Sequence, residues 1–147
     1  MNQYLEFISN HYLLSLAWVV VLYLLIQDLI ENSFNKYKGL SPLLAVTKMN
    51  SSESVKVIDV REIHEYIKGH IEDSLNIPLS KLDDQLPELE GLKSQPVIVV
   101  CHTGTRSIPA CKTLIKAGFQ DVYNITGGMQ SWEDNKLPIQ ITSKNKS

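Results

Sequence analysis

PVIVVCHTGTRSIPACKTLIKAG, residues 96–118, is the stretch that decides the fold. Residues 96–100 form an apolar run rich in β-branched side chains, which is typical of a central strand in a parallel sheet covered on both faces. A short polar loop follows, and a helix is expected from residue 107 to about residue 117, with Gly118 past its end. Because a strand that leads through a loop into a helix is half of a βαβ unit, this stretch predicts an α/β domain.

The same alternation continues on both sides. Further strands are expected at residues 55–60, 74–77 and 121–125, and further helices at residues 43–49, 62–68, 80–89 and 128–132. Right-handed crossovers between such strands give a mainly parallel central sheet flanked by helices. We therefore predict one α/β domain at residues 41–138, a polar linker at residues 31–40 and a flexible C-terminal tail at residues 139–147.

An apolar segment distinguishes the N-terminus. Residues 7–27 contain no Asp, Glu, Lys or Arg, and as a helix they would be about 31 Å long, which matches the hydrocarbon core of a bilayer. The segment is apolar on all sides, so a soluble core helix is disfavoured. A cleaved signal peptide is also disfavoured, because no basic residue precedes the segment and no small-residue cleavage site follows it. Residues 1–30 are thus predicted to be a transmembrane anchor that contacts lipid through residues 7–27.

Charges beside this anchor predict its orientation. Lys36, Lys38 and Lys48 all lie on its C-terminal side, whereas the N-terminal flank carries no basic side chain. Positive charge stays on the cytoplasmic side of a membrane. We therefore expect a single-pass protein of the cell (inner) membrane whose α/β domain faces the cytoplasm.

The composition narrows the function further. The formal net charge of the 147 residues is -2, and no dense run of Lys or Arg occurs, which disfavours nucleic-acid binding. Cys101 and Cys111, ten residues apart, lack the paired spacing of a zinc site, and nothing suggests a disulfide scaffold. Reduced thiols without a metal or other cofactor are the expectation.

The loop after the central strand carries the predicted chemistry. A cysteine between a buried strand and a helix faces unpaired N–H groups and the positive end of the helix dipole, which favours a thiolate. Gly104 lets the backbone curl so that N–H groups point inward, and Arg106 adds a positive charge suited to an oxyanion. Cys101 alone could be a small residue in a turn, but the pattern Cys-x-x-Gly-x-Arg in this context favours catalysis.

Three ordered motifs resemble the rhodanese family over roughly residues 41–138. The first is IDVRE at residues 58–62, which continues through Glu65-Tyr66, GHI at residues 69–71 and SLNIP at residues 74–78. The second is the loop CHTGTRS at residues 101–107, and the third is Gly118-Phe119 with GGMQSW at residues 127–132.

This resemblance implies a rhodanese-like fold and a two-step sulfur transfer. The Cys101 thiolate would take a sulfur from thiosulfate or a persulfide, and a thiol, cyanide or protein acceptor would remove it. The implied substrate-binding residues follow Cys101 directly: His102, Thr103, Gly104, Thr105 and Arg106. Their N–H groups would stabilise the persulfide, and Arg106 would bind the donor's oxyanion. Related phosphatases have a loop one residue longer, so this loop resembles the sulfur-handling branch.

Other polar residues of these motifs are expected to be structural. Asp59 and Arg61 are expected to form a buried hydrogen-bonded pair, and His70 fits a turn residue better than a base. Cys111 is expected to be a buried apolar residue, with a resolving or sulfur-relay thiol as the alternative. Trp132 should pack the last helix on the sheet.

Three functions remain open at this point. The first is a thiosulfate sulfurtransferase-like enzyme, and the second is a membrane-tethered persulfide carrier with little thiosulfate turnover. The third is a non-catalytic interaction module, which retention of Cys101 and Arg106 disfavours because such modules commonly lose the cysteine.

Overall fold

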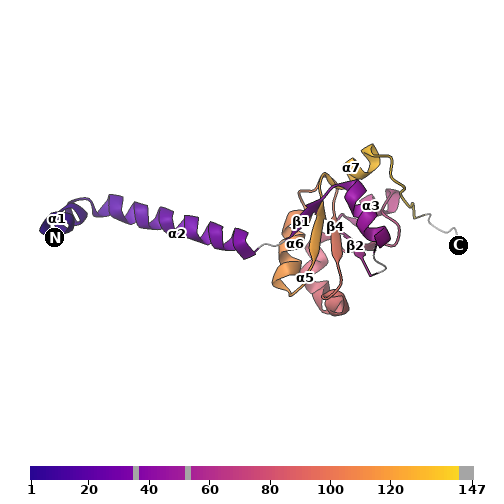
Figure 1. The fold of residues 1–147 in the computed structure, drawn as a ribbon, viewed down its shortest axis with the longest axis horizontal. Coiled ribbons are helices and arrows are strands. Elements are labelled where there is room, and N and C mark those ends of the chain that lie inside the picture. Colours follow the sequence, from indigo (N-terminus) through magenta and orange to yellow (C-terminus); the bar gives the residue numbers. More distant parts are fainter. Residues whose placement is uncertain (35–36, 52–53, 143–147) are drawn as a thin grey trace. The chain divides into compact units, whose positions relative to one another are not determined.

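The computed structural model describes residues 1–34, 37–51 and 54–142. The chain divides into two compact units, Met1–Lys36 and Tyr37–Ser147. The first contains helices α1 (Asn2–Asn10) and α2 (Tyr12–Phe34), and the second is an α/β domain (Figure 1). The boundary therefore falls inside the predicted linker, whose residues 35 and 36 lie outside the described residues.

The apolar N-terminal segment is not one continuous helix. α1 ends at Asn10, and at the following residue, His11, the backbone leaves the helical region (φ −127°, ψ 38°). Asn10 and His11 are weak helix formers, so a break there costs little. The expectation of a helix through residues 7–27 is corrected accordingly, because the stretch long and apolar enough to cross a membrane is Tyr12–Ile30.

The domain is built on a five-stranded sheet with the order β1-β5-β4-β2-β3, in which all neighbouring strands are parallel. The strands are β1 (Lys38–Leu40), β2 (Lys56–Asp59), β3 (Leu75–Asn76), β4 (Val97–Val100) and β5 (Val122–Ile125). The central strand β4 is buried along its whole length, as its apolar run predicted. The predicted α/β fold with a parallel sheet is confirmed.

Strand β1 corrects the prediction that residues 31–40 are a linker. Lys38–Leu40 pairs in parallel with β5, and Thr126 N–H donates to the Leu40 carbonyl at 2.8 Å. Three residues are too few to show an alternating pattern, so only the exposed edge of β5 identifies this segment as a strand.

Helices cover both faces of the sheet. They are α3 (Pro42–Ser51), α4 (Ile63–Lys68), α5 (Leu82–Gln85), α6 (Ser107–Lys116) and α7 (Gly128–Asp134), with 3-10 segments η1 (Leu79–Lys81) and η2 (Leu86–Leu92). The predicted single helix at residues 80–89 is wrong, since this stretch divides into η1, α5 and η2. Pro87 stands at the start of η2 and supplies no N–H to the preceding turn.

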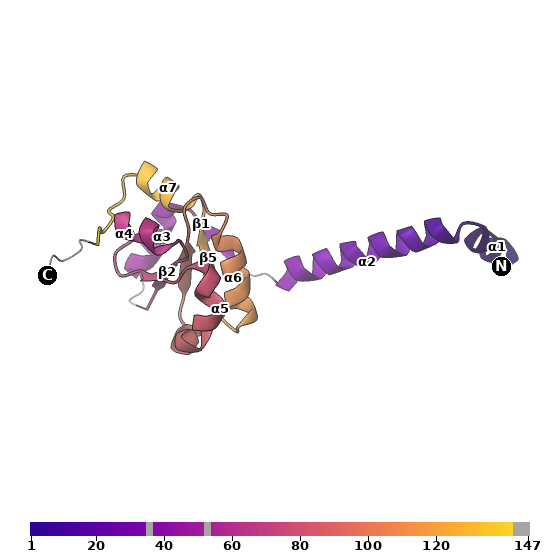
Figure 2. The same cartoon turned by 180° about the vertical axis from the view of Figure 1, so that it is seen from behind.

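Two apolar clusters hold these layers together. Leu82, Leu89 and Leu114 pack with Ile58 and Val99 on the face covered by α5, η2 and α6 (Figures 1 and 2). On the other face, α3 and α7 contribute Ala45, Met129 and Trp132, which pack with Ile98 and Val100. The predicted packing role of Trp132 is confirmed. Its indole N–H also donates to the Pro138 carbonyl at 3.0 Å.

The beginning of the predicted C-terminal tail is ordered against the domain. Gln140 exchanges two backbone hydrogen bonds with His70, at 2.9 and 2.7 Å, and Thr142 N–H donates to Ile67 at 3.2 Å. The expectation of a flexible tail from residue 139 is therefore wrong for residues 139–142, because their backbone groups pair with α4 and the turn that follows it. Residues 143–147 lie outside the described residues.

Candidate active site

Cys101 lies directly after the carboxyl end of β4, where ligands bind in parallel sheets. Its side chain is fully buried. The Gly104 N–H donates to Cys101 Sγ at 3.0 Å, and Sγ lies 3.4 Å from the Ser107 hydroxyl at the start of α6. The sulfur thus meets a backbone N–H and the N-terminus of a ten-residue helix, both of which stabilise negative charge on it.

Two glycines give this loop its shape. Gly104 has a φ of +90°, and a Cβ there would lie 3.0 Å from the Gly127 nitrogen. Gly128 has a φ of +59°, and a Cβ there would overlap the carbonyl group of Cys101 and come within 2.7 Å of that of His102. Both positions require a left-handed backbone and close approach, which only glycine supplies without strain.

Helix α7 binds the carbonyl side of the same loop. Met129 N–H donates to the Cys101 carbonyl at 2.8 Å, and Gln130 N–H donates to the His102 carbonyl at 3.0 Å. These amides belong to the first turn of α7 and have no partner within their own helix. The loop is therefore held between two helix N-termini, with α7 on its carbonyls and α6 behind the sulfur.

Two buried polar side chains, those of Ser107 and Asn124, support the loop by hydrogen bonds. The Ser107 hydroxyl lies 3.0 Å from the Gly104 carbonyl and 2.5 Å from Asn124 Oδ1, while Asn124 Nδ2 donates to the same carbonyl at 3.3 Å. Both side chains are buried. The role of Ser107 and Asn124 was not predicted from the sequence, although a lone Asn in the apolar strand β5 was a visible signal.

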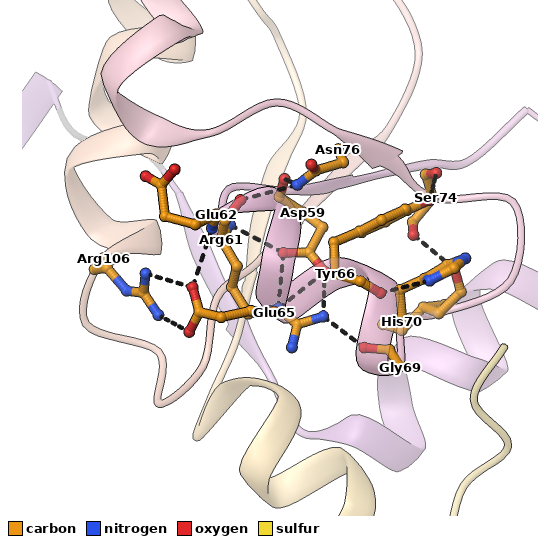
Figure 3. Close-up of polar contacts among 11 residues, drawn as sticks. Asp59, Arg61, Glu62, Glu65, Tyr66, Gly69, His70, Ser74, Asn76 and Arg106 are labelled. Atoms are coloured by element: carbon orange, nitrogen blue, oxygen red, sulfur yellow. Dashed lines mark hydrogen bonds and ion pairs between the residues drawn. The ribbon is translucent and has the colours of Figure 1, made fainter. Parts of the chain in front are cut away.

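Arg106 is engaged by Glu65 of α4. Its Nη1 and Nη2 donate to the two Glu65 carboxylate oxygens at 3.0 and 2.8 Å (Figure 3). The hydrogen bond from Arg106 lowers the pKa of Glu65 to about 2, and the same pairing raises the pKa of Arg106. Both terminal nitrogens hydrogen-bond Glu65 in the structure, and the contact of Arg106 with a donor oxyanion stays a prediction.

This geometry agrees with the comparisons. Residues 44–135 match the family described as the Rhodanese-like domain, which covers more than half of the chain. The chain belongs to the rhodanese family. The family predicted from the three motifs is confirmed.

Individual relatives of this rhodanese agree. YibN of Escherichia coli (strain K12) is 31% identical over 140 residues, which cover 95% of this chain and 97% of YibN. A sulfurtransferase of Allochromatium vinosum is 32% identical over 92 residues, 63% of this chain and 84% of that protein. The crystal structure of a rhodanese-related protein from Thermoplasma volcanium superposes with a TM-score of 0.65 at 30% identity, over 72% of this chain and all of that one. These similarities support sulfur transfer in general.

The first rhodanese motif builds the platform that carries Glu65. Arg61 lies in a buried ion pair with Asp59 at 2.7 Å and donates at the same distance to the Gly69 carbonyl (Figure 3). Asn76 Nδ2 donates to the carbonyls of Asp59 and Arg61 at 3.1 and 2.9 Å. The expected structural role of Asp59 and Arg61 is confirmed, because the pair ties both ends of α4 to the sheet.

His70 and Cys111 pack inside this rhodanese as structural residues. His70 is buried, stacks on Tyr66 with ring centroids 3.8 Å apart and hydrogen-bonds the Tyr66 carbonyl through Nδ1 (Figure 3). Burial raises the pKa of Cys111 to about 12, so this thiol stays protonated, as expected of a core residue.

The predicted substrate-binding residues that follow Cys101 differ in their exposure to solvent. His102, Thr103 and Thr105 are exposed, Gly104 is buried and Arg106 is half-buried. Nothing in these surroundings assigns the His102 ring a partner in proton transfer, so its expected contribution remains its backbone.

Proposed function

We propose that this rhodanese moves a sulfane sulfur through a persulfide on Cys101. The observation that carries the proposal is the 3.0 Å hydrogen bond from the Gly104 N–H to Cys101 Sγ at the N-terminus of α6. The thiolate attacks the outer sulfur of the donor, and the electron pair of the broken bond leaves with sulfite from thiosulfate or with a thiolate from a persulfide. A thiol, cyanide or protein acceptor then attacks the outer sulfur and restores the Cys101 thiolate.

The loop is proposed to stabilise the transferred sulfur. The Gly104 N–H points at Cys101 Sγ, and we propose that the other backbone N–H groups of residues 102–106 and the amino end of α6 also face a sulfur added to Cys101. They favour the negative charge that the persulfide carries. His102, Thr103, Gly104 and Thr105 contribute through their backbone.

The N-terminal helix is proposed to anchor the enzyme in the cell (inner) membrane. Tyr12–Ile30 is long and apolar enough to span a bilayer, and none of its side chains is buried by protein. A helix of this kind satisfies its own backbone groups and needs lipid around its side chains. Lys38 and Lys48 follow on its C-terminal side, which supports the proposal that the α/β domain faces the cytoplasm.

Mass spectrometry with matched cysteine variants tests the sulfur chemistry. Wild type incubated with thiosulfate or cysteine persulfide should gain the mass of one sulfur atom, located on Cys101. Cys101→Ser should not gain it, because a hydroxyl cannot form a persulfide, whereas the control Cys111→Ser should retain most of the labelling and the transfer to cyanide. Equal labelling of both variants, or a loss of labelling only in Cys111→Ser, would contradict the assignment of Cys101 as the residue that carries the sulfur. Turnover with thiosulfate separates an enzyme from a persulfide carrier.

A further inference from the structure

The ion pair between Glu65 and Arg106 is held from both sides. Arg106 uses both terminal nitrogens on the two oxygens of Glu65. Glu65 also accepts the Glu62 N–H at 3.0 Å in the capping box that begins α4. Since Arg61 ties α4 to the sheet through Asp59 and Gly69, Glu65 is presented to Arg106 by a rigid support.

Charges around the pair are balanced. The shallow pocket beside the loop is lined by Arg61, Glu65, Lys68, Gly69, His102 and Glu133. Arg61 is neutralised by Asp59 and Arg106 by Glu65, while Lys68 and Glu133 oppose each other in sign. A donor that approaches the loop through this pocket finds no surplus positive charge.

We propose that Glu65 determines the donor class of this rhodanese. By holding Arg106 in an ion pair, it makes the loop favour a persulfide, whose reacting end carries at most one negative charge, over the thiosulfate dianion. This inference rests on the proposed sulfur transfer through Cys101. Glu65 acts as a positioning residue, since it sets the charge that Arg106 offers and does not itself contact the donor.

The chemistry of the two donors explains the selection. With a persulfide, a bond forms between Cys101 Sγ and the outer sulfur while the donor's S–S bond breaks, and the electron pair leaves on a thiolate of single charge. No oxidant or reductant is needed. With thiosulfate, the same attack brings a dianion to a thiolate and releases the sulfite dianion. That step profits from a guanidinium whose charge is not neutralised, which Arg106 offers only after it separates from Glu65.

Removal of the Glu65 charge tests the proposal. The full chain in detergent is assayed for kcat/KM with thiosulfate and with cysteine persulfide, as wild type, Glu65→Gln and the exposed control Glu88→Gln. Glutamine retains an oxygen for the Glu62 N–H, so the start of α4 is preserved. Glu65→Gln should raise kcat/KM for thiosulfate about tenfold relative to the persulfide, the equivalent of about 1.4 kcal/mol. Glu88→Gln should leave the ratio unchanged.

A second variant and salt distinguish this role from a merely structural one. Glu65→Gln/Arg106→Gln should lose the gain, because the freed guanidinium is its source. In wild type, higher ionic strength should raise kcat/KM for thiosulfate and change that for the persulfide little, since salt screens repulsion between like charges. This measurement needs no variant to fold.

The outcomes are separable. Wild-type transfer from thiosulfate as efficient as from the persulfide, an equal loss with both donors in Glu65→Gln, or a fall in thiosulfate transfer with salt would overturn the role of Glu65 and leave Cys101 chemistry standing. If wild type transferred sulfur from neither thiosulfate nor the persulfide, the proposed function itself would be overturned, and this inference with it.

Discussion

At the scale of single residues, Glu65 links parts of the chain that are far apart in sequence. It accepts hydrogen bonds from the Arg106 side chain and from the Glu62 amide, so one carboxylate serves both the loop and the start of α4. These contacts favour the ionised form, and the hydrogen bond from Arg106 is the largest cause of the lowered pKa. Stability of the fold and charge at the site are therefore coupled through the same group.

The coupling predicts a pH dependence of stability. The pKa of Glu65 is about 2 in the folded chain against an ordinary value of 4.5, so the folded state binds fewer protons than the unfolded state. The stabilisation is present above about pH 4.5 and is lost as the pH falls towards about 2. Urea unfolding of wild type and Glu65→Gln should thus differ most at neutral pH and converge in acid. A difference that is constant with pH, or one matched by Glu88→Gln, would contradict this account.

At the scale of elements, α7 has a role that its small size does not suggest. Its first turn binds the carbonyls of Cys101 and His102, and the approach needed for these bonds leaves no room for a side chain at Gly128. The closing motif of the sequence therefore supports the loop that begins at Cys101 as well as the core, into which Met129 and Trp132 pack.

Gly128→Ala should damage the loop through this contact. The left-handed backbone alone costs about 1–3 kcal/mol for a residue with a side chain, and overlap with the Cys101 carbonyl adds to it. We expect lower stability in chemical unfolding and a loss of sulfur transfer. Gly91→Ala is the matched control, because a Cβ at Gly91 meets nothing within 4 Å, and it should change stability by no more than about 0.5 kcal/mol. Similar behaviour of the two variants would argue against the contact.

At the scale of the whole molecule, the chain combines an α/β domain of the rhodanese family with an apolar helix, Tyr12–Ile30, none of whose side chains is buried. Large side chains on opposite sides of α2, such as Leu16 and Leu25, are exposed. In water this surface would be unfavourable, so the proposed environment of Tyr12–Ile30 is lipid. Each unit folds by its own rule: the helix by its backbone hydrogen bonds, and the domain by its two apolar clusters.

The proposed orientation is tested with introduced cysteines, because Cys101 and Cys111 are both buried and would react slowly on either side. In a Cys101→Ser/Cys111→Ser background, Asn2→Cys introduces one exposed thiol N-terminal to α2. In a second variant, Glu88→Cys introduces one C-terminal to α2. A reagent that cannot cross the inner membrane should label Asn2→Cys in intact cells and label Glu88→Cys only after lysis. The reverse pattern would place the domain outside the cytoplasm, and labelling of both would argue against a membrane span.

The sequence by itself determined the features that depend on neighbouring residues. The apolar run of β4, the turn that follows it and the helix of α6 are local patterns, so the parallel sheet and the position of Cys101 were predictable. The burial of Cys111 and the pairing of Asp59 with Arg61 followed from residue type and short spacing.

Only the tertiary structure decided what rests on contacts between distant segments. Strand β1 exists because β5 offers an edge, and residues 139–142 are ordered because α4 and His70 offer hydrogen-bonding partners. Arg106 meets Glu65 across 41 positions of sequence, and Gly128 meets the catalytic loop through the packing of α7. Such contacts form when the sheet brings strand ends together, and no local sequence pattern predicts them. The position of Cys101 could thus be predicted from the sequence, whereas the charge around it was decided by the fold.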